Sequence, residues 1–315
     1  MLPIIFGESR IILLAGIAAA FLCSFLGIRF GMSSLPRDGG RKFAVNGALS
    51  KGKPRGAGLI FVAAFTVCGV LFVPFTAENL IYILLVVGGM MSGYLDDASD
   101  KPWNEYKKGL IDLVISIVTV VTFLNYNSST IYFGSMEVEI PKIVYGILGI
   151  ILIWVSVNVT NCSDGVDGLC ASLCIVVLVA FNVIFPETLG KYAVADFLFA
   201  AVLLAYLYFN SSPSSMLMGD AGSRALGFYI AIIAMKSQHP FIYLLVAAVL
   251  IIDGGLGLIK VFLLRFLKIA ILKNTRTPIH DHMRKNKGWS DTQVVARFVI
   301  LQVMAAAVAY LIVQI

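Results

Sequence analysis

Long apolar runs alternate with short polar segments along the whole chain. Runs of roughly 17–25 apolar residues are typical of helices that cross a lipid bilayer. We therefore predict an all-α polytopic membrane protein with about ten transmembrane helices, in one integral membrane domain over residues 1–315. The apolar runs cover 11–30, 56–73, 80–95, 110–124, 143–157, 169–185, 193–209, 225–235, 241–272 and 292–313.

Two stretches depart from this alternation. The run 241–272 is too long for one perpendicular crossing, so we expect a kink, a tilt or an end that lies along the membrane surface. The segments 130–133 and 136–140 are short and alternating, and they flank Gly134-Ser135. This pattern predicts a short external β-hairpin.

Composition supports a membrane protein and argues against other classes. Hydrophobic residues make up 59% of the 315 residues and charged residues 13%, which is more apolar than a soluble domain needs. The five cysteines lie in or beside apolar runs without metal-ligand spacing, so we interpret them as packing residues. The formal charge of +6 does not indicate nucleic-acid binding, because the basic residues lie in loops between the runs.

The basic residues are unevenly divided between the loops. Segments 31–55, 96–108, 158–168, 210–224 and 265–292 hold 17 of the 24 Lys and Arg residues. Because Lys and Arg favour the cytoplasmic side of a membrane, we expect these five loops on that face and both termini on the outer face. The polar clusters that could carry chemistry all fall in these same loops.

The first candidate site is the pair Asp96-Asp97, which follows the run 80–95. Such a pair can simply face water at a helix end, where the two carboxylates repel each other. It also suits Mg²⁺, which takes one or two carboxylates and completes its shell with water and phosphate oxygens. Asp220 precedes the run 225–235 in Gly-Asp-Ala-Gly, where it either caps the helix or helps to form a phosphate site.

Two further polar stretches hold candidate ligands. Within Asn158–Leu169, Asp164 and Asp167 have the alternative role of capping the next helix, and Asn158 and Asn161 that of closing a turn. The last loop carries His280 and His282 among basic residues that suit a pyrophosphate, and it has no third soft ligand for zinc. Acidic metal ligands and basic phosphate ligands at one membrane face indicate phosphoryl-type transfer to a lipid carrier.

At these residues the chain resembles the polyprenyl-phosphate N-acetylhexosamine-1-phosphate transferases over nearly its whole length. Four motifs carry the resemblance: Asp96-Asp97, Asn158–Leu169, the segment Asn210–Ser223 with Gly-Asp-Ala-Gly-Ser, and Thr277–Arg297. The last is most similar to the branch that transfers phospho-N-acetylmuramoyl-pentapeptide. Departures are Asp281 between His280 and His282, where that branch has a third histidine, Leu217 in place of an aromatic, and the absence of a lysine at the start of the helix expected from 110.

The resemblance implies a reaction and a role for each motif. The enzyme would transfer phospho-N-acetylmuramoyl-pentapeptide from UDP-N-acetylmuramoyl-pentapeptide to undecaprenyl phosphate, would need Mg²⁺, and would lie in the bacterial inner membrane with a possible homodimer. Asp96, Asp97 and Asp220 would be catalytic, and Asp97, Asn161 and Asp220 would hold the metal. The expected substrate-binding residues are Asn158, Asp164, Asp167, Asn210, Lys101, His280 and His282.

Three alternatives remain at this point. Pro54-Arg55 is more similar to the branch that uses UDP-N-acetylglucosamine. A secondary transporter also places carboxylates in broken helices, although nearer the membrane midplane. Asp253, inside the run 241–272, is a carboxylate of this kind, and we interpret it as structural. The third alternative is a catalytically inactive protein that binds a sugar lipid.

Overall fold

The computed structural model describes residues 10–40, 50–99, 101, 103–134, 136–190 and 192–314, and it confirms the predicted helical membrane protein. The elements are α2 (Arg10–Gly31), η1 (Met32–Ser34), α3 (Gly58–Phe72), α4 (Ala77–Asp97), α5 (Glu105–Tyr126), β1 (Thr130–Phe133), β2 (Met136–Glu139), α6 (Lys142–Ser163), α7 (Leu169–Ile184), α8 (Pro186–Leu189), α9 (Ala193–Asn210), α10 (Gly219–Lys236), α11 (Ile242–Val246), α12 (Ala248–Phe262), the π-helical turn η2 (Leu263–Leu267), α13 (Ile279–Lys287) and α14 (Asp291–Gln314).

Six of the described helices are long and apolar enough to cross a membrane. They are α2 with η1, α4, α5, α6, α9 and α14, and α3 and α7 are shorter apolar helices. The predicted count of about ten crossings therefore stays a prediction. The hairpin is confirmed, because β1 and β2 pair antiparallel with Thr130 opposite Glu139; Ser135 of its turn lies outside the described residues.

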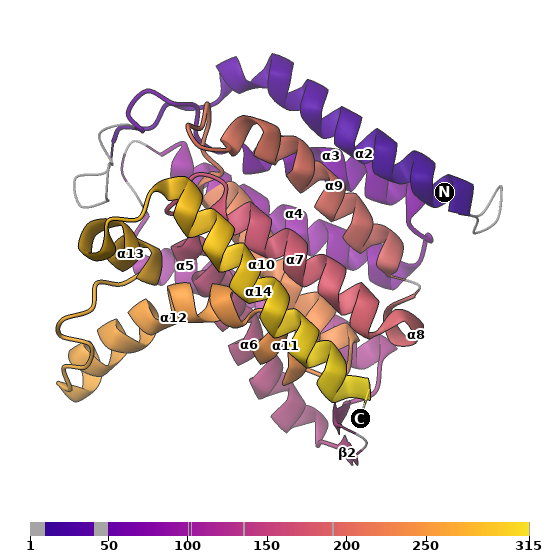
Figure 1. Cartoon of the computed structure of the whole chain (residues 1–315). Helices are drawn as coiled ribbons and strands as arrows, with labels where there is room; N and C mark the ends of the chain where they lie inside the picture. The colour runs from indigo at the N-terminus through magenta and orange to yellow at the C-terminus, as the bar shows by residue number, and fades with distance from the viewer. Residues whose placement is uncertain are drawn as a thin grey trace.

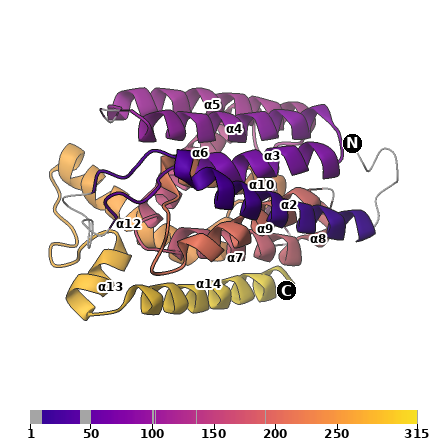
Figure 2. The ribbon, with the colours of Figure 1, turned by 90° about the horizontal axis from the view of Figure 1, so that it is seen from above.

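Helix α10 lies at the centre of the bundle, between the layer of α4 and α5 and the layer of α7 and α14 (Figures 1 and 2). All its residues except Asp220 are buried. It packs extensively against α4 and α6. The contact with α4 is close enough that a Cβ on Gly93 would lie 2.2 Å from the Asp220 carbonyl oxygen, so a larger residue there would push the two helices apart.

Several helix ends differ from the prediction in the same way. Helix α4 includes Asp96-Asp97, α6 runs on through Asn158 and Asn161, and α10 begins at Gly219, so polar residues expected in loops lie in terminal helical turns. The expected loop around His280 is the helix α13. Apolar runs predict only the lipid-contacting part of a helix, and these ends continue because polar groups of neighbouring segments bind them.

The long run 241–272 is broken, as predicted. Helix α11 ends at Val246, α12 begins at Ala248 after the single residue Ala247, and η2 follows α12 directly. In Figure 1, α12 leaves the bundle at an angle and ends away from its neighbours.

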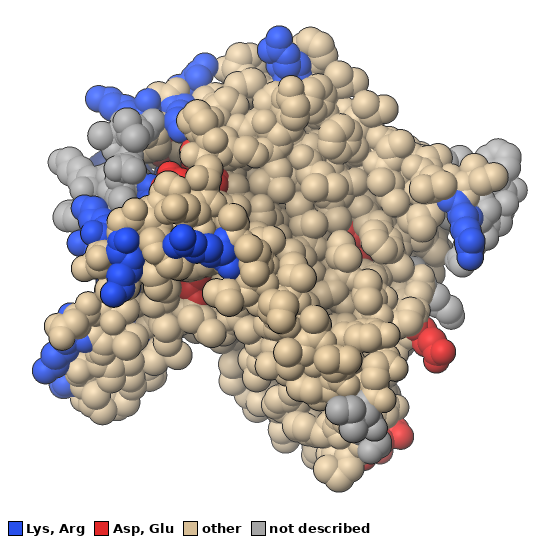
Figure 3. Space-filling model, viewed as in Figure 1, with Lys and Arg blue, Asp and Glu red and all other residues tan. Residues whose placement is uncertain are grey.

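The five basic segments lie at one end of the bundle, as far as the structure describes them. Lys and Arg side chains gather at this end in Figure 3, and both marked chain ends lie at the other end in Figure 1. Residues 41–49 of the first segment are outside the described residues. The prediction that the polar clusters share one face of the bundle is therefore confirmed.

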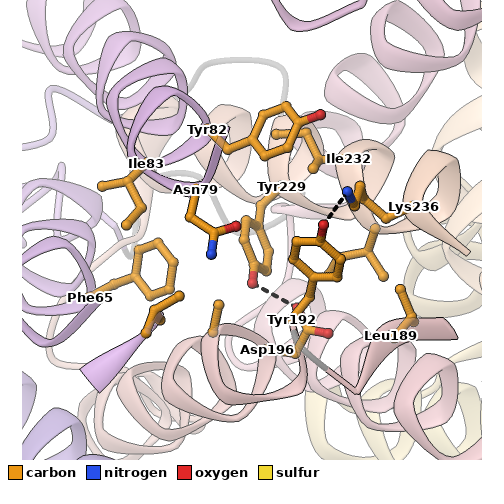
Figure 4. Close-up of a pocket in the computed structure, with 13 residues that line it drawn as sticks. Phe65, Asn79, Tyr82, Ile83, Leu189, Tyr192, Asp196, Tyr229, Ile232 and Lys236 are labelled. Carbon is orange, nitrogen blue, oxygen red and sulfur yellow. Dashed lines mark hydrogen bonds between the residues drawn. The ribbon is translucent and has the colours of Figure 1, made fainter. Parts of the chain in front are cut away.

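The opposite end of α4 and α10 carries a separate buried network. Lys236 donates to Glu78 at 2.8 Å, and Asn127 donates to the same carboxylate at 2.7 Å. Figure 4 shows the adjoining cavity, where Tyr229 donates to Asp196 at 2.6 Å. These groups bind one another and are distant from the Asp97 end of α4, so they hold helices together and do not belong to the site below.

Candidate active site

Three carboxylates meet where the C-terminal end of α4 touches the N-terminal end of α10. Asp96 and Asp97 lie in the last turn of α4 and Asp220 in the first turn of α10. Their side chains are 8%, 0% and 15% exposed. Because buried carboxylates are costly without partners, such a cluster requires cations around it.

Two cations lie between these carboxylates. Arg55 Nη2 is 2.9 Å from Asp97 Oδ1 and 3.4 Å from Asp220 Oδ1. Lys108 Nζ is 3.2 Å from Asp220 Oδ2 and also contacts Asp96 Oδ2. Each cation therefore joins Asp220 to one member of the α4 pair.

Arg55 is positioned by backbone pairing with two distant segments. Its amide donates to Pro36 O at 2.8 Å, and Leu217 N donates to Pro54 O at 2.8 Å. Burial lowers the pKa of the Arg55 guanidinium, but Asp97, Asp220 and Asp38 raise it, and the net pKa lies above its ordinary value. Arg55 is thus a fixed positive charge at the site.

The start of α10 holds the Asp97 carboxylate from the other side. Ala221 N donates to Asp97 Oδ2 at 3.3 Å. Gly219 has φ +73°, and a Cβ there would lie 2.3 Å from the same oxygen, so glycine is required. The capping interpretation of Asp220 is wrong, because Met218 is the N-cap residue and Asp220 faces the two cations.

The two asparagines of the stretch Asn158–Leu169 differ in whether they contact the carboxylate cluster. Asn161 Nδ2 donates to Ser223 Oγ of α10 at 2.9 Å, and the Asn161 side chain also forms a hydrogen bond with the Asp220 carboxylate. Asn158 lies one turn earlier and donates to Trp154 O of its own helix at 2.8 Å. The structure therefore brings Asn161 to the cluster and leaves Asn158 on the side of α6.

Asp167 and Asn210 tie two loops together beside the cluster. Asp167 lies 3.8 Å from Lys53 and accepts from Ser214 N at 2.9 Å. Asn210 accepts from Gly168 N at 2.8 Å and donates to Met216 O at 2.8 Å. These contacts fix the loop surfaces on which a nucleotide is expected.

The interpretation of Asp164 and Asp167 as caps of α7 is also wrong. Gly168 is the N-cap residue of α7 and no side chain caps it, whereas Asp164 is the C-cap residue of α6. Both aspartates are half-buried at the polar end of the bundle.

The two histidines occupy different environments. His280 is buried, and its backbone amide donates to Asp253 Oδ1 at 2.8 Å while its Nδ1 lies 2.8 Å from Asp253 Oδ2. Asp253, interpreted from sequence as structural, therefore orients a candidate substrate-binding histidine. His282 is half-buried, and its Nδ1 accepts from Arg276 N at 3.3 Å.

The lysine that reaches the carboxylates is Lys108, which the sequence did not single out; the role of Lys101 in substrate binding stays a prediction. Lys101 is exposed, whereas Lys108 reaches two of the three carboxylates. The expectation that no lysine begins this helix is wrong, because α5 starts at Glu105 after the N-cap Asn104, whose side chain accepts from Lys107 N. Asn104-Glu105 is a helix-start signal that could have identified the lysine.

A matched pair of variants separates the two lysines. Lys108→Met removes a charge shared by Asp96 and Asp220, so we expect turnover to fall about thirtyfold or more, as ~2 kcal/mol of lost stabilisation implies. Lys101→Met should change turnover less than about threefold, since the side chain is solvated. Steady-state assays of both purified variants measure the difference, and equal losses would contradict this placement.

The donor set fits Mg²⁺ better than a soft metal. Among the described residues no group of three or more His, Cys, Asp or Glu is arranged to hold a metal ion. Mg²⁺ needs only one or two carboxylates. Asp97 and Asp220 meet at one guanidinium, and Asp97 Oδ1 is buried with no hydrogen-bond partner in the described structure apart from that ion pair.

Comparison with known proteins is consistent with this geometry. The sequence model described as glycosyl transferase family 4 matches residues 79–238, which include all three carboxylates. A phospho-N-acetylmuramoyl-pentapeptide-transferase of Treponema pallidum is 37% identical over 96% of this chain and 91% of its own. Proteins of the same name from Clostridium acetobutylicum and Dictyoglomus thermophilum are 27% and 29% identical, over 82% and 80% of this chain and 84% and 81% of theirs.

Proposed function

The chain belongs to glycosyl transferase family 4, and from this we propose that it transfers phospho-N-acetylmuramoyl-pentapeptide from its UDP-linked donor to undecaprenyl phosphate. The products are UMP and the first lipid intermediate of peptidoglycan. The observation that carries the proposal is the meeting of Asp96, Asp97 and Asp220 with Arg55 and Lys108 at one end of an apolar bundle. This end is where a charged nucleotide sugar and a membrane-anchored phosphate can meet.

The bond changes define what the residues must do. An oxygen of the acceptor phosphate attacks the phosphorus that carries the sugar, and the bond from that phosphorus to the oxygen of UMP breaks. Negative charge accumulates around that phosphorus, so fixed positive charges stabilise the transition state. Arg55 and Lys108 supply such charges, and their burial against carboxylates keeps them in place before substrate binds.

The three carboxylates take different parts in this proposal. Asp96 lies beside Lys108 and accepts from Trp103 N at 2.7 Å. It would either receive a proton from the acceptor phosphate or hold that phosphate in position. Asp97 and Asp220, with Asn161, would hold Mg²⁺. When bound, the ion supplies charge neutralisation for the diphosphate.

The remaining candidates would bind the rest of the donor. We assign Asn158, Asp164, Asp167 and Asn210 to the nucleoside side, Lys101 to the substrate entrance, and His280 and His282 to the pyrophosphate side. Asp253 supports this assignment of His280, because two contacts to one carboxylate fix the direction of the ring.

The lipid acceptor needs a path from the bilayer to the cluster. We propose that it enters beside the broken segment α11–α12, where α12 diverges from the bundle (Figure 1). The polar end would face the cytoplasm of a bacterial inner-membrane protein, since Lys and Arg gather there (Figure 3). We also propose a homodimer, as the family resemblance implies.

Single-cysteine labelling tests the orientation. In a background without the native cysteines, Glu137→Cys in the hairpin should react with an impermeant reagent in intact cells. Lys287→Cys at the end of α13 should react only after the membrane is opened. Both side chains are exposed, so burial does not limit labelling. The reverse pattern would place the proposed site outside the cell.

Release of UMP tests the function itself. Purified protein with UDP-N-acetylmuramoyl-pentapeptide, undecaprenyl phosphate and Mg²⁺ should form UMP and a lipid-linked product in equal amounts. A transporter would release no UMP, and an inactive binding protein would bind the donor without turnover. Omission of the lipid phosphate is the control, because the proposed reaction requires an acceptor.

A further inference from the structure

A second buried pair of opposite charges lies one helical turn from the carboxylate cluster. Arg224 of α10 contacts the Asp112 carboxylate of α5, and the two side chains are 6% and 5% exposed. Arg224 Nη2 also donates to Ser92 Oγ of α4 at 3.0 Å. The pair thus lies among the same three helices that supply Asp96, Asp97, Lys108 and Asp220, and the reaction outlined above does not use it.

The two layers of charge are arranged in opposite order. Asp112 follows Lys108 by four residues on α5, and Arg224 follows Asp220 by four residues on α10. Residues four apart are neighbours on one face of a helix. The Lys108–Asp220 pair therefore stacks on the Asp112–Arg224 pair, with the positive charge on α5 in the first layer and on α10 in the second.

This order matters for Lys108. Its ammonium group contacts Asp96 and Asp220 and also attracts Asp112, its neighbour along α5. An unpaired Asp112 carboxylate in an apolar interior would compete strongly for that ammonium group. Arg224 removes the competition by binding Asp112 itself.

We infer that Arg224 is a positioning residue: by binding Asp112 it leaves the Lys108 ammonium group on Asp96 and Asp220, where the diphosphate is proposed to bind. This inference rests on the proposed function. It assigns the pair no contact with substrate, and it predicts that the sign of the charge at each position matters, not merely the presence of an ion pair.

The first test removes one charge and then both. Arg224→Met leaves Asp112 free to take Lys108, so we expect kcat to fall about tenfold or more with donor KM changed less than about threefold. Adding Asp112→Asn removes the competing carboxylate and should return kcat to within about threefold of the unmodified protein. A double variant no more active than Arg224→Met, or an Arg224→Met variant with normal kcat, overturns the inference.

The second test exchanges the charges. The variant Asp112→Arg with Arg224→Asp rebuilds an ion pair between α5 and α10, so a purely structural role predicts recovered activity. The inference predicts that kcat stays at least about tenfold low, because an arginine then stands next to Lys108 and an aspartate next to Asp220. Recovery in this variant would show that the pair only joins helices.

Two controls make these outcomes readable. Ser92→Ala removes the other hydrogen bond of Arg224 and keeps the pair, so kcat should stay within about twofold. Thermal unfolding in detergent identifies variants that have lost their fold. If Arg224→Met does not fold, the neutral double variant alone decides, because the inference expects it to be active. Failure of the proposed function would instead leave the unmodified protein without UMP release.

Discussion

Asp97→Asn should lower turnover about a thousandfold, which corresponds to ~4 kcal/mol of lost transition-state stabilisation. The substitution keeps the size of the side chain and removes its charge. The carboxylate is fully buried, binds Arg55 at 2.9 Å and accepts from Ala221 N, so its charge organises both the cation and the start of α10. Initial rates of UMP release, measured with the purified variant at saturating substrates, give the effect.

Asp38→Asn is the matched control for that variant. Asp38 is also a buried aspartate beside Arg55, but it lies in the segment before α3 and binds Nη1 of the guanidinium at 3.5 Å, whereas Asp97 and Asp220 share Nη2. If Asp97 served only to hold Arg55, the two variants would lose similar activity. We expect Asp38→Asn to lose less than about tenfold. Normal turnover by Asp97→Asn would show that Asp97 takes no part in the reaction and is only a polar residue at the end of α4.

UDP-N-acetylmuramoyl-pentapeptide should be used at least about a hundredfold more efficiently than UDP-N-acetylglucosamine, compared as kcat/KM. The reason lies in the segment Thr277–Arg297, which α13 places beside the polar loops: Arg284 Nη1 donates to Gly165 O at 3.4 Å. A donor without the lactyl-peptide group would leave polar groups of the segment Thr277–Arg297 without hydrogen-bond partners. Parallel assays with both donors and the same lipid phosphate measure the ratio.

Arg55 is the observation that favours the other donor, because the Pro54-Arg55 pattern resembles the N-acetylglucosamine branch. In the structure Arg55 binds Asp97 and Asp220, so it belongs to the diphosphate end, which both donors share. Leu217 likewise pairs through its backbone with Pro54. Its smaller side chain should weaken uracil stacking without changing donor identity. Better use of UDP-N-acetylglucosamine would show the branch to be wrong and leave the reaction class intact.

The helices and the acidic part of the site could be read from the sequence for simple physical reasons. Apolar runs must be helical in a membrane, because backbone groups have no water to bind there. Carboxylates that persist in so apolar a chain indicate a functional site. The asymmetry of Lys and Arg between the loops then predicts that Asp97 and Asp220 lie on the same side of the membrane. Their contacts with Arg55 confirm that the two residues lie at the same end of the bundle.

What could not be predicted depends on contacts between distant segments. Arg55 is placed by backbone pairing with residues near Pro36 and Leu217, a pairing that leaves no periodic signal. His280 and Asp253 are 27 residues apart, on different helices. Asn161 was expected in a loop because the apolar run ends before it, yet the helix continues to Ser163 where α10 offers it a partner.

The network at the far end of α4 and α10 has a mechanical consequence for the near end. The two helices are fastened at both extremities, through Glu78 and Lys236 at one and through Asp97 and the Ala221 amide at the other. Helices α4 and α10 therefore cannot slide or rotate against each other without breaking a buried contact. Movement that admits substrate is therefore expected outside this helix pair, at the exposed turn η2, where the chain beyond α12 ends away from the bundle.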